Sequence, residues 1–425
     1  MASPEPIESL RKDGKCGHQR IAHDQYSPTC RVSRFEQGGR SEEIHLLIEP
    51  PEDGCLEEQV EQVVTQYHDA LQSLDLPRHT AVFRRCFLSD AANQLDAVMA
   101  SPLGIAVPTS EAAAISCIEQ PPVSNRKLAL LAYHIRDVEP DAKTFKPIPN
   151  AGPYARALMV ERPERTLLWS TQMAAQPRAL RQLCSGVETQ CSLDQTGRLF
   201  SAYRDHLASV GATLRENAVR TWLFVHNVDN HYAGVVKARR KLFASEGLTR
   251  DTHYIVSTGI EGRNEQSRSV VTLDAFTILG LAEGQMVYID CLDHLNRTDE
   301  YGVTFERAGH LDFGNRSHIN ISGTASIDAN GQIMHEGDIL RQVERTIENV
   351  SALLEVAGAS LDDMASMIVY LRDSADAKRV IAFLDENHPG LPFVAVQAPV
   401  CRPGWLVEIE GLAIAPNEDP RWPKF

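Results

Sequence analysis

A cysteine and a glutamate near the end of the chain have the types and the spacing to do chemistry together. Cys401 stands seven residues before Glu408, and the Arg-Pro-Gly segment between them is typical of a tight turn. The sequence predicts a hairpin in which the two side chains lie near each other on paired strands. A thiol beside a carboxyl that burial keeps protonated is a candidate reaction centre. The alternative is a small buried cysteine and a salt-bridged surface glutamate.

Several arginines are candidates for binding an anionic substrate, because a guanidinium group binds a carboxylate through two hydrogen bonds. The candidates are Arg240, Arg307, Arg372 and Arg402. Arg239 and Arg240 are consecutive on a predicted helix and point about 100° apart, so only one of them, taken here as Arg240, faces a cleft. Each arginine has the alternative of being solvated or ion-paired on the surface.

Three further polar residues complete the candidate binding site. Tyr232 could donate a hydrogen bond to a carboxylate, and Thr258 opens a Thr-Gly-Ile-Glu-Gly loop whose amides could cradle an anion. Glu410 shares a strand face with Glu408, where a second carboxyl raises the pKa of the first. A plain hairpin at Thr258 and an arginine partner for Glu410 are the alternatives.

Composition excludes several classes of function. The chain has 425 residues and a net charge of -15, which disfavours nucleic-acid binding. The chain has no apolar run of about eighteen residues, so we expect no membrane helix. Residues 1–19 lack the apolar core of a signal peptide. The nine cysteines show no zinc spacing, and no histidine motif or nucleotide-binding loop is present. We expect no metal, no cofactor and a cytoplasmic protein with reduced thiols.

The C-terminal part predicts an alternation of strands and helices. Residues 323–328 are typical of a strand, and apolar residues at a 3-4 spacing over 338–357 predict a helix that ends at Gly358. A strand at 366–372, a helix at 375–386, a strand at 393–400 and a hairpin partner at 406–414 follow. The thiol and the acid lie at this last hairpin.

The same order of elements occurs three times, at a spacing of roughly 125–150 residues. Helix, strand, helix and two strands are predicted over residues 193–278 and again over 57–135. The prediction is an α+β fold of three units: 41–150, 151–298 and 299–425. The first 40 residues carry many charges and few apolar runs, so we expect a flexible segment there.

The C-terminal unit resembles the RidA (YjgF) family. The resemblance lies in the Ile-Ser-Gly-Thr-Ala-Ser-Ile-Asp run from Ile321, in Gly337-Asp338 and Gln342, in the Val-Tyr-Leu-Arg-Asp run from Val369, and in the Val-Glu-Ile-Glu run from Val407. RidA proteins are homotrimers with clefts between subunits, so three fused units imply a single-chain pseudo-trimer. RidA deaminases carry a substrate-binding arginine on the strand that matches 393–400; this chain has none there, which places imine or enamine deamination in doubt.

From about Val219 onward the chain also resembles the chorismatase family, whose body is likewise a RidA-like pseudo-trimer; Cys401 and Glu408, Gly314 and the run from Tyr301 to Arg307 carry this resemblance. That resemblance implies that Glu408 is the proton donor and that Cys401 steers the reaction, either by attacking the ring or by excluding water. It also implies that Gly314 is the small residue that accompanies Cys401 on an earlier strand.

Three functions remain open at this point. The first is a chorismatase-like lyase or hydrolase that releases pyruvate from chorismate or a similar cyclic enol-ether acid in secondary metabolism. The second is a diverged RidA-like enzyme that acts on an imine, an enamine or another reactive intermediate, and the third is a non-catalytic ligand-binding protein. We expect a small anionic cyclic metabolite as partner, and a monomeric pseudo-trimer or a homodimer.

Overall fold

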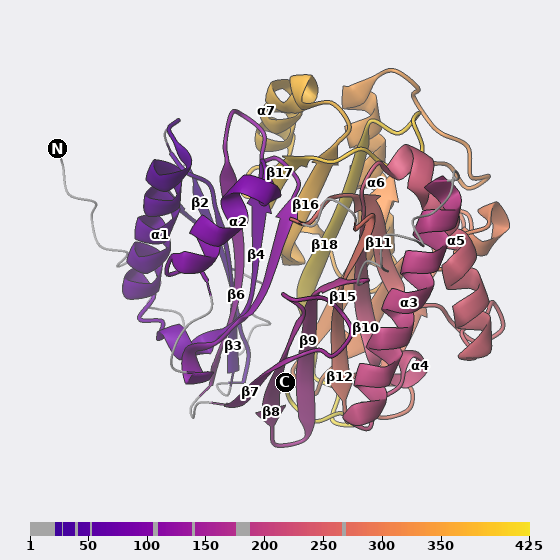
Figure 1. The fold of residues 1–425 in the computed structure, drawn as a ribbon, viewed down its shortest axis with the longest axis horizontal. Coiled ribbons are helices and arrows are strands. Elements are labelled where there is room, and N and C mark those ends of the chain that lie inside the picture. The colour runs from indigo at the N-terminus through magenta and orange to yellow at the C-terminus, as the bar shows by residue number, and fades with distance from the viewer. Residues whose placement is uncertain are drawn as a thin grey trace, which may run out of the picture.

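Three six-stranded sheets with helices on their outer faces make up the protein in the computed structural model (Figure 1). The structure describes residues 22–27, 29–38, 41–51, 53–104, 109–137, 141–175, 188–265 and 269–425. Each sheet contains six strands that are consecutive in the sequence, so each sheet with its helices is one unit. The three predicted units of an α+β pseudo-trimer are confirmed.

The elements of the three units follow the same order. The first unit contains β1 (Ala22–Ser27), β2 (Cys30–Glu36), β3 (Ser41–Ile48), α1 (Leu56–Ser73), β4 (Ala81–Leu88), α2 (Ala91–Ala100), β5 (Ala114–Glu119) and β6 (Leu128–Asp137). The second contains β7 (Ala142–Pro147), β8 (Arg156–Arg162), β9 (Arg165–Ala174), α3 (Glu188–Ser209), α4 (Leu214–Asn217), β10 (Ala218–Val225), α5 (Val228–Ser245), β11 (Val256–Glu261) and β12 (Val271–Leu279). The third contains β13 (Met286–Ile289), β14 (Ala308–Asp312), β15 (Arg316–Ala325), α6 (Ile339–Val356), β16 (Met364–Leu371), α7 (Ala377–Asn387), β17 (Phe393–Gln397) and β18 (Val407–Pro416).

The strand order within the sheets is identical. It runs β1-β2-β3-β6-β4-β5 in the first sheet, β7-β8-β9-β12-β10-β11 in the second and β13-β14-β15-β18-β16-β17 in the third. The fourth strand of each unit pairs in parallel with the fifth and antiparallel with the sixth, and it carries a bulge after its first residue in all three units. The repeat therefore extends to strand register, and residues of the three units can be matched one by one.

The last two strands do not form the predicted hairpin. β16 lies between β17 and β18, pairing with one on each side. All eight residues of β16 are buried, and a strand inside a sheet needs hydrogen-bond partners on both edges. Residues 398–406 consequently cross one end of β16, and Cys401 lies in this connection rather than on a strand paired with that of Glu408.

The unit boundaries also differ from the prediction at four short strands. β1 and β2 belong to the first sheet although residues 1–40 were expected to be flexible, β7 belongs to the second sheet and β13 to the third. These strands lie at or near sheet edges, where one-sided burial leaves a weak apolar pattern. In β7 no residue is fully buried.

The helix α6 illustrates how the sequence specifies the outer layer. Asp338 caps the helix by accepting a hydrogen bond from the amide of Arg341, and Gly358 follows its end with a left-handed φ of 74°. Val343, Ile347 and Val350 are buried against the sheet.

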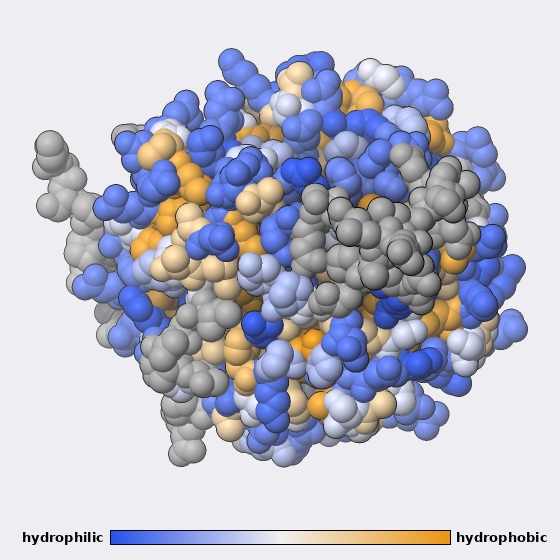
Figure 2. All heavy atoms as spheres, viewed as in Figure 1, coloured by the Kyte–Doolittle hydropathy of each residue, from blue (hydrophilic) through white to orange (hydrophobic). Residues whose placement is uncertain are grey.

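Polar side chains cover most of the visible face of the molecule, with scattered apolar patches (Figure 2). No helix among the described residues is long and apolar enough to cross a membrane.

One buried ion pair lies at each junction between units. Arg85 and Asp274 join the first and second units at 3.1 Å, and Arg220 and Glu410 join the second and third at 3.0 Å. Arg316 and Glu43 join the third and first units at 2.7 Å. All six side chains are at most 3% exposed, and an unpaired charge at such depth is strongly destabilising. The three pairs consequently favour one arrangement of the units.

Candidate active site

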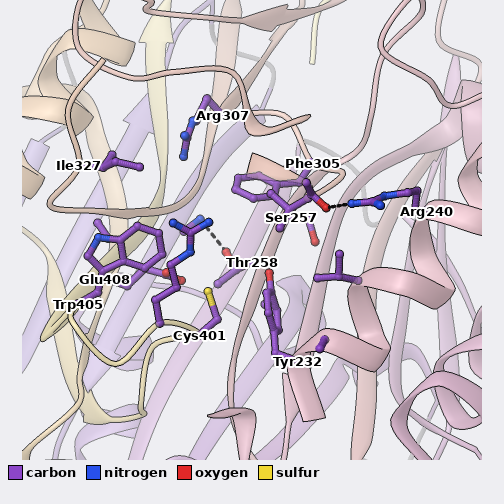
Figure 3. Close-up of a pocket in the computed structure, with 18 of the residues that line it drawn as sticks. Tyr232, Arg240, Ser257, Thr258, Phe305, Arg307, Ile327, Cys401, Trp405 and Glu408 are labelled. Atoms are coloured by element: carbon purple, nitrogen blue, oxygen red, sulfur yellow. Dashed lines mark hydrogen bonds between the residues drawn. The ribbon is translucent and has the colours of Figure 1, made fainter. Parts of the chain in front are cut away.

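A cavity of about 500 Å³ lies between the second and third units. The second unit contributes one face of α5 and the strand β11, while the third contributes β15, β18 and the loops 302–307 and 401–405. Figure 3 shows Tyr232 and Arg240 on the helix side, with Glu408, Trp405 and Arg307 on the opposite side. The site thus depends on two units being correctly joined.

Among the described residues, Glu408 is the single acidic side chain that lines this cavity. It lies on β18 between Ala325 of β15 and Tyr370 of β16, and it is 5% exposed. Burial, followed by the charge of Glu410, raises the pKa of the Glu408 carboxyl to about 8, and Arg307 opposes this rise. Glu408 is therefore a protonated acid at neutral pH that faces an open space.

Gly323 makes room for this carboxyl. A Cβ added to Gly323 would lie 2.2 Å from Oε1 of Glu408 and 3.1 Å from Cγ2 of Thr258. The amide of Gly323 donates to the hydroxyl of Thr258 across the unit junction at 3.0 Å. A side chain at residue 323 would occupy the position of the acid.

Cys401 lines the same cavity, as predicted, although it lies in a loop. Burial, followed by the charge of Glu408, raises the pKa of its thiol to about 12, while a hydrogen bond from Tyr232 works in the opposite direction. Since the thiolate is the nucleophilic form of cysteine, this thiol is a weak nucleophile at neutral pH. Burial thus favours the neutral form of the Cys401 thiol.

Four cationic side chains line the cavity: Lys237, Arg240, Arg307 and Arg402. Arg240 donates to the carbonyl of Gly302, and Arg307 donates to the carbonyl of Asn296 at 2.9 Å. The guanidinium of Arg402 lies over the ring of Trp405 at 5.0 Å. Contacts to main-chain carbonyls hold Arg240 and Arg307 in place. The cavity lining thus contains four cationic side chains and the carboxyl of Glu408, in a chain whose net charge is -15.

Lys237 is a cavity residue that the sequence analysis missed. It lies one turn after Ala233 on the same face of α5, and both line the cavity. The signal was the spacing of Ala233, Lys237 and Arg240 along a helix, but only arginines were considered as carboxylate ligands. The apolar part of the wall consists of Val236, Phe305, Ala325, Ile327 and Trp405.

Three predicted site residues lie outside the cavity. Gly314 stands at the turn between β14 and β15, where its amide donates to the carbonyl of Pro423 at 2.9 Å; the glycine of the cavity is Gly323 instead. Arg372 pairs with Asp229 at 2.8 Å. Glu410 accepts hydrogen bonds from Arg220 and from Nε1 of Trp222, at 3.0 and 2.8 Å, and lies outside the cavity lining. Their predicted contact with a substrate is corrected accordingly.

The register shows what the other two units carry at the position of the acid. Glu408 lies opposite Tyr370, Thr272 lies opposite Phe224, and Ala129 lies opposite Phe87. Neither threonine nor alanine can donate a proton as a carboxyl does. The acid is thus specific to the junction between the second and third units. Among the described residues, no group of three potential metal ligands lies together.

Comparison with known proteins places these residues in a family. Residues 313–415 match the family model described as endoribonuclease L-PSP. A RutC family protein of Pyrococcus abyssi is 35% identical over 99 residues, which are 22% of this chain and 76% of that protein. The chain belongs to the RutC family. A second RutC family protein, from Pyrococcus horikoshii, is 34% identical over 97 residues, covering 22% of this chain and 75% of that protein.

The RutC-family match confirms the predicted RidA (YjgF)-like superfamily, and a solved structure extends the likeness to the other units. A crystal structure of a chorismatase covers 79% of this chain and 93% of its own, with a TM-score of 0.56 and 16% identity. At this identity the likeness concerns the fold. The predicted similarity to the chorismatase body is confirmed at that level.

Proposed function

We propose that this RutC-family protein is a chorismatase-like lyase or hydrolase that releases pyruvate from chorismate or a similar cyclic enol-ether acid. The observation that carries the proposal is Glu408, a buried acid with a pKa of about 8 in a cavity lined by four cations. A cavity of about 500 Å³ lies within the range of small-molecule sites. We further infer a cytoplasmic enzyme of secondary metabolism that works as a monomeric pseudo-trimer or a homodimer.

The chemistry begins with protonation of a carbon atom. Glu408 gives its proton to the vinyl methylene carbon of the substrate, which turns the enol ether into a good leaving group. The bond between the ether oxygen and the ring breaks, and pyruvate leaves with that oxygen. When the ring becomes aromatic it loses one proton, which restores Glu408, so a hydroxybenzoate-type product and pyruvate balance chorismate without added water.

The other cavity residues bind and shield the substrate. Chorismate is a dianion, and Lys237, Arg240, Arg307 and Arg402 provide the positive charge that its two carboxylates require. Tyr232 of α5 and Thr258 of β11 offer hydroxyl groups on the side of the second unit. Cys401 and the apolar wall exclude water from the cationic intermediate, which favours loss of a ring proton over hydrolysis.

The test is pyruvate release from chorismate by the purified protein, followed with lactate dehydrogenase. We expect turnover that falls as the pH rises through about 8, because Glu408 must be protonated. Glu408→Gln should lower kcat at least about 100-fold. A loss of only one third would be expected if all three units carried an active acid, but the positions that match Glu408 hold Thr272 and Ala129. Absence of pyruvate, or full activity of the variant, contradicts the proposal.

The RidA-like alternative predicts a different product. If the cavity hydrolyses an imine or enamine, ammonia should appear from freshly generated imino acids while chorismate stays intact. The strand β17 carries no arginine, which argues against the usual deaminase substrate. If neither pyruvate nor ammonia appears and chorismate still binds, the ligand-binding alternative holds.

A further inference from the structure

A buried pair of charges lies beside Glu408, on the same face of β18 but outside the cavity lining. Arg220 of β10 and Glu410 of β18 are both 3% exposed, and their side chains approach to 3.0 Å. Glu410 is also held by Nε1 of Trp222, at 2.8 Å. Because Glu408 and Glu410 are two residues apart on one strand, their side chains point to the same face. The charge of Glu410 is thus fixed beside the acid of the cavity.

Arg220 makes two more contacts, and both support the cavity. It donates to the main-chain carbonyl of Ile321, at 2.7 Å, and to the hydroxyl of Thr258, at 3.2 Å. Ile321 precedes the bulge of β15 that contains Gly323, against which the carboxyl of Glu408 lies. One guanidinium group therefore contacts the carboxylate of Glu410, the strand against which Glu408 lies and a hydroxyl that lines the cavity.

We propose that Arg220 and Glu410 are a positioning pair that sets both the position and the protonation of Glu408. The catalytic importance of this pair rests on the proposed function. Arg220 fixes the geometry, since it ties β15 and β11 to β18. Glu410 supplies a negative charge that disfavours ionisation of Glu408. Neither residue lines the cavity, so the pair acts through Glu408 and not on a substrate.

Other charged and titratable groups surround Glu408, and the proposal has to hold in their presence. Arg307 opposes the effect of Glu410, and Cys401 and Tyr370 carry raised pKa values close to the acid. The remaining neighbours are Arg402 in the adjacent loop, Lys237, Arg240 and Tyr232 on α5, and Arg85, whose Nη1 lies 3.8 Å from Glu410. The cations all favour the ionised form, so Glu410 and burial are the two influences that keep Glu408 protonated.

The experiment measures the ionisation of Glu408 itself. Infrared difference spectra taken across a pH series, with the spectrum of Glu408→Gln subtracted, isolate its carboxyl band without any substrate. In the unmodified protein this band should titrate near pH 8. In Glu410→Gln it should titrate at least about one pH unit lower, because the negative charge is lost while the size of the side chain is kept.

Two matched variants separate charge from structural damage. Glu43→Gln removes the carboxylate of the buried pair at the third junction, which lies 2.7 Å from Arg316 and is absent from the cavity wall. It should lower stability as much as Glu410→Gln does, while the Glu408 band stays in place. Glu410→Asp keeps the charge and should keep the band near its original position although packing is disturbed.

Arg220→Lys tests whether Arg220 fixes the position of Glu408. It also provides a second test of the pair if Glu410→Gln does not fold. It keeps the positive charge but cannot make three separate contacts, so kcat should fall at least about 10-fold while KM stays within about threefold. An unshifted band in Glu410→Gln, or an equal shift in Glu43→Gln, overturns the role of Glu410. Unchanged kcat in Arg220→Lys overturns the role of Arg220.

The outcomes distinguish this inference from the proposed function. If the band shifts as expected but chorismate yields no pyruvate, the role of Glu410 stands and the proposed function fails. If pyruvate is released and the band does not move, the proposed function stands and the pair fails.

Discussion

The carboxyl of Glu408 occupies the space that a side chain at Gly323 would take. A Cβ at residue 323 would lie 2.2 Å from Oε1 and 2.8 Å from Cδ of Glu408, although the two residues are on different strands. The atoms nearest to such a Cβ all belong to side chains and none to the backbone, so a side chain at residue 323 would not disturb the fold. The absence of a side chain at residue 323 therefore serves the position of the acid.

Gly323→Ala should displace the acid while leaving the protein folded. Since the clashing atoms belong to the end of a flexible side chain, the carboxyl will rotate away, and a displacement of about 1 Å costs about 100-fold in kcat. The measurement is pyruvate release together with a thermal melt. Gly197→Ala is the control, because nothing lies within 4 Å of the new methyl group. Wild-type kcat in Gly323→Ala would contradict this account of the glycine.

The sequence was sufficient to predict those helices and strands whose apolar residues follow the period of the element, because one face or both faces of the element are buried. The helix α6 and the strand β16 carry apolar residues at the period of their structure, and both were predicted within two residues of their ends. The short edge strand β7 was missed because its outer position removes the apolar pattern. The threefold repeat was visible since it involves the order of elements rather than their residues.

The site was harder to predict, because it depends on register between strands that are distant in the sequence. Gly314 and Gly323 are both glycines before or on β15, and only the pairing of β15 with β18 shows that Gly323 meets Glu408. Similarly, alternation placed Glu410 on the face of Glu408, but it could not show that Arg220 from another unit binds Glu410 outside the cavity lining.

Lys237 provides a test of substrate binding by the positive cavity. Lys237→Gln should raise KM for chorismate about tenfold, because a hydrogen bond to a charged group contributes roughly 1.5–3 kcal/mol, while kcat should change little. Lys241→Gln is the control: Lys241 lies one turn further along α5 and lines a separate groove beside α3. Equal effects of the two variants would show that only the general charge of the helix matters.

Cys401 should resist alkylation at neutral pH. Its thiol has a pKa of about 12, so very little thiolate is present at pH 7. Cys55 is exposed and provides an internal reference within the same sample. After treatment with iodoacetamide, peptide mass spectrometry should show Cys55 modified first and Cys401 largely unmodified. Faster labelling of Cys401 than of Cys55 would instead indicate an activated nucleophile.

The role of Cys401 as a space-filling group leads to an expectation for its variants. Cys401→Ala should retain pyruvate release within about 10-fold, since proton donation by Glu408 is unaffected. The cavity it leaves admits water near the ring, so the fraction of hydrolysed product should rise. Chromatography of the products measures this fraction, and complete loss of pyruvate release in Cys401→Ala would argue for covalent attack by the thiol.

The raised pKa of Glu408 should also be visible in the stability of the protein. Its pKa is about 8 in the folded state and 4.5 without the protein environment, so between these pH values the folded state binds one more proton than the unfolded state. Stability consequently falls as the pH rises from about 4.5 to about 8 and is level, for this group, above that range.

Replacing Glu408 by glutamine removes this penalty. The free energy of unfolding of Glu408→Gln should exceed that of the unmodified protein by at least about 1 kcal/mol at pH 9, and the difference should shrink toward pH 5, where Glu408 is protonated in the folded state. Urea titrations at the two pH values measure it. Glu43→Gln should behave in the opposite way: Arg316 and His318 lower the pKa of Glu43, so its loss leaves a buried cation unpaired and destabilises the protein at both pH values. If Glu408→Gln were also destabilising at pH 9, the carboxyl would be ionised and satisfied in the fold, and it could not be the proton donor.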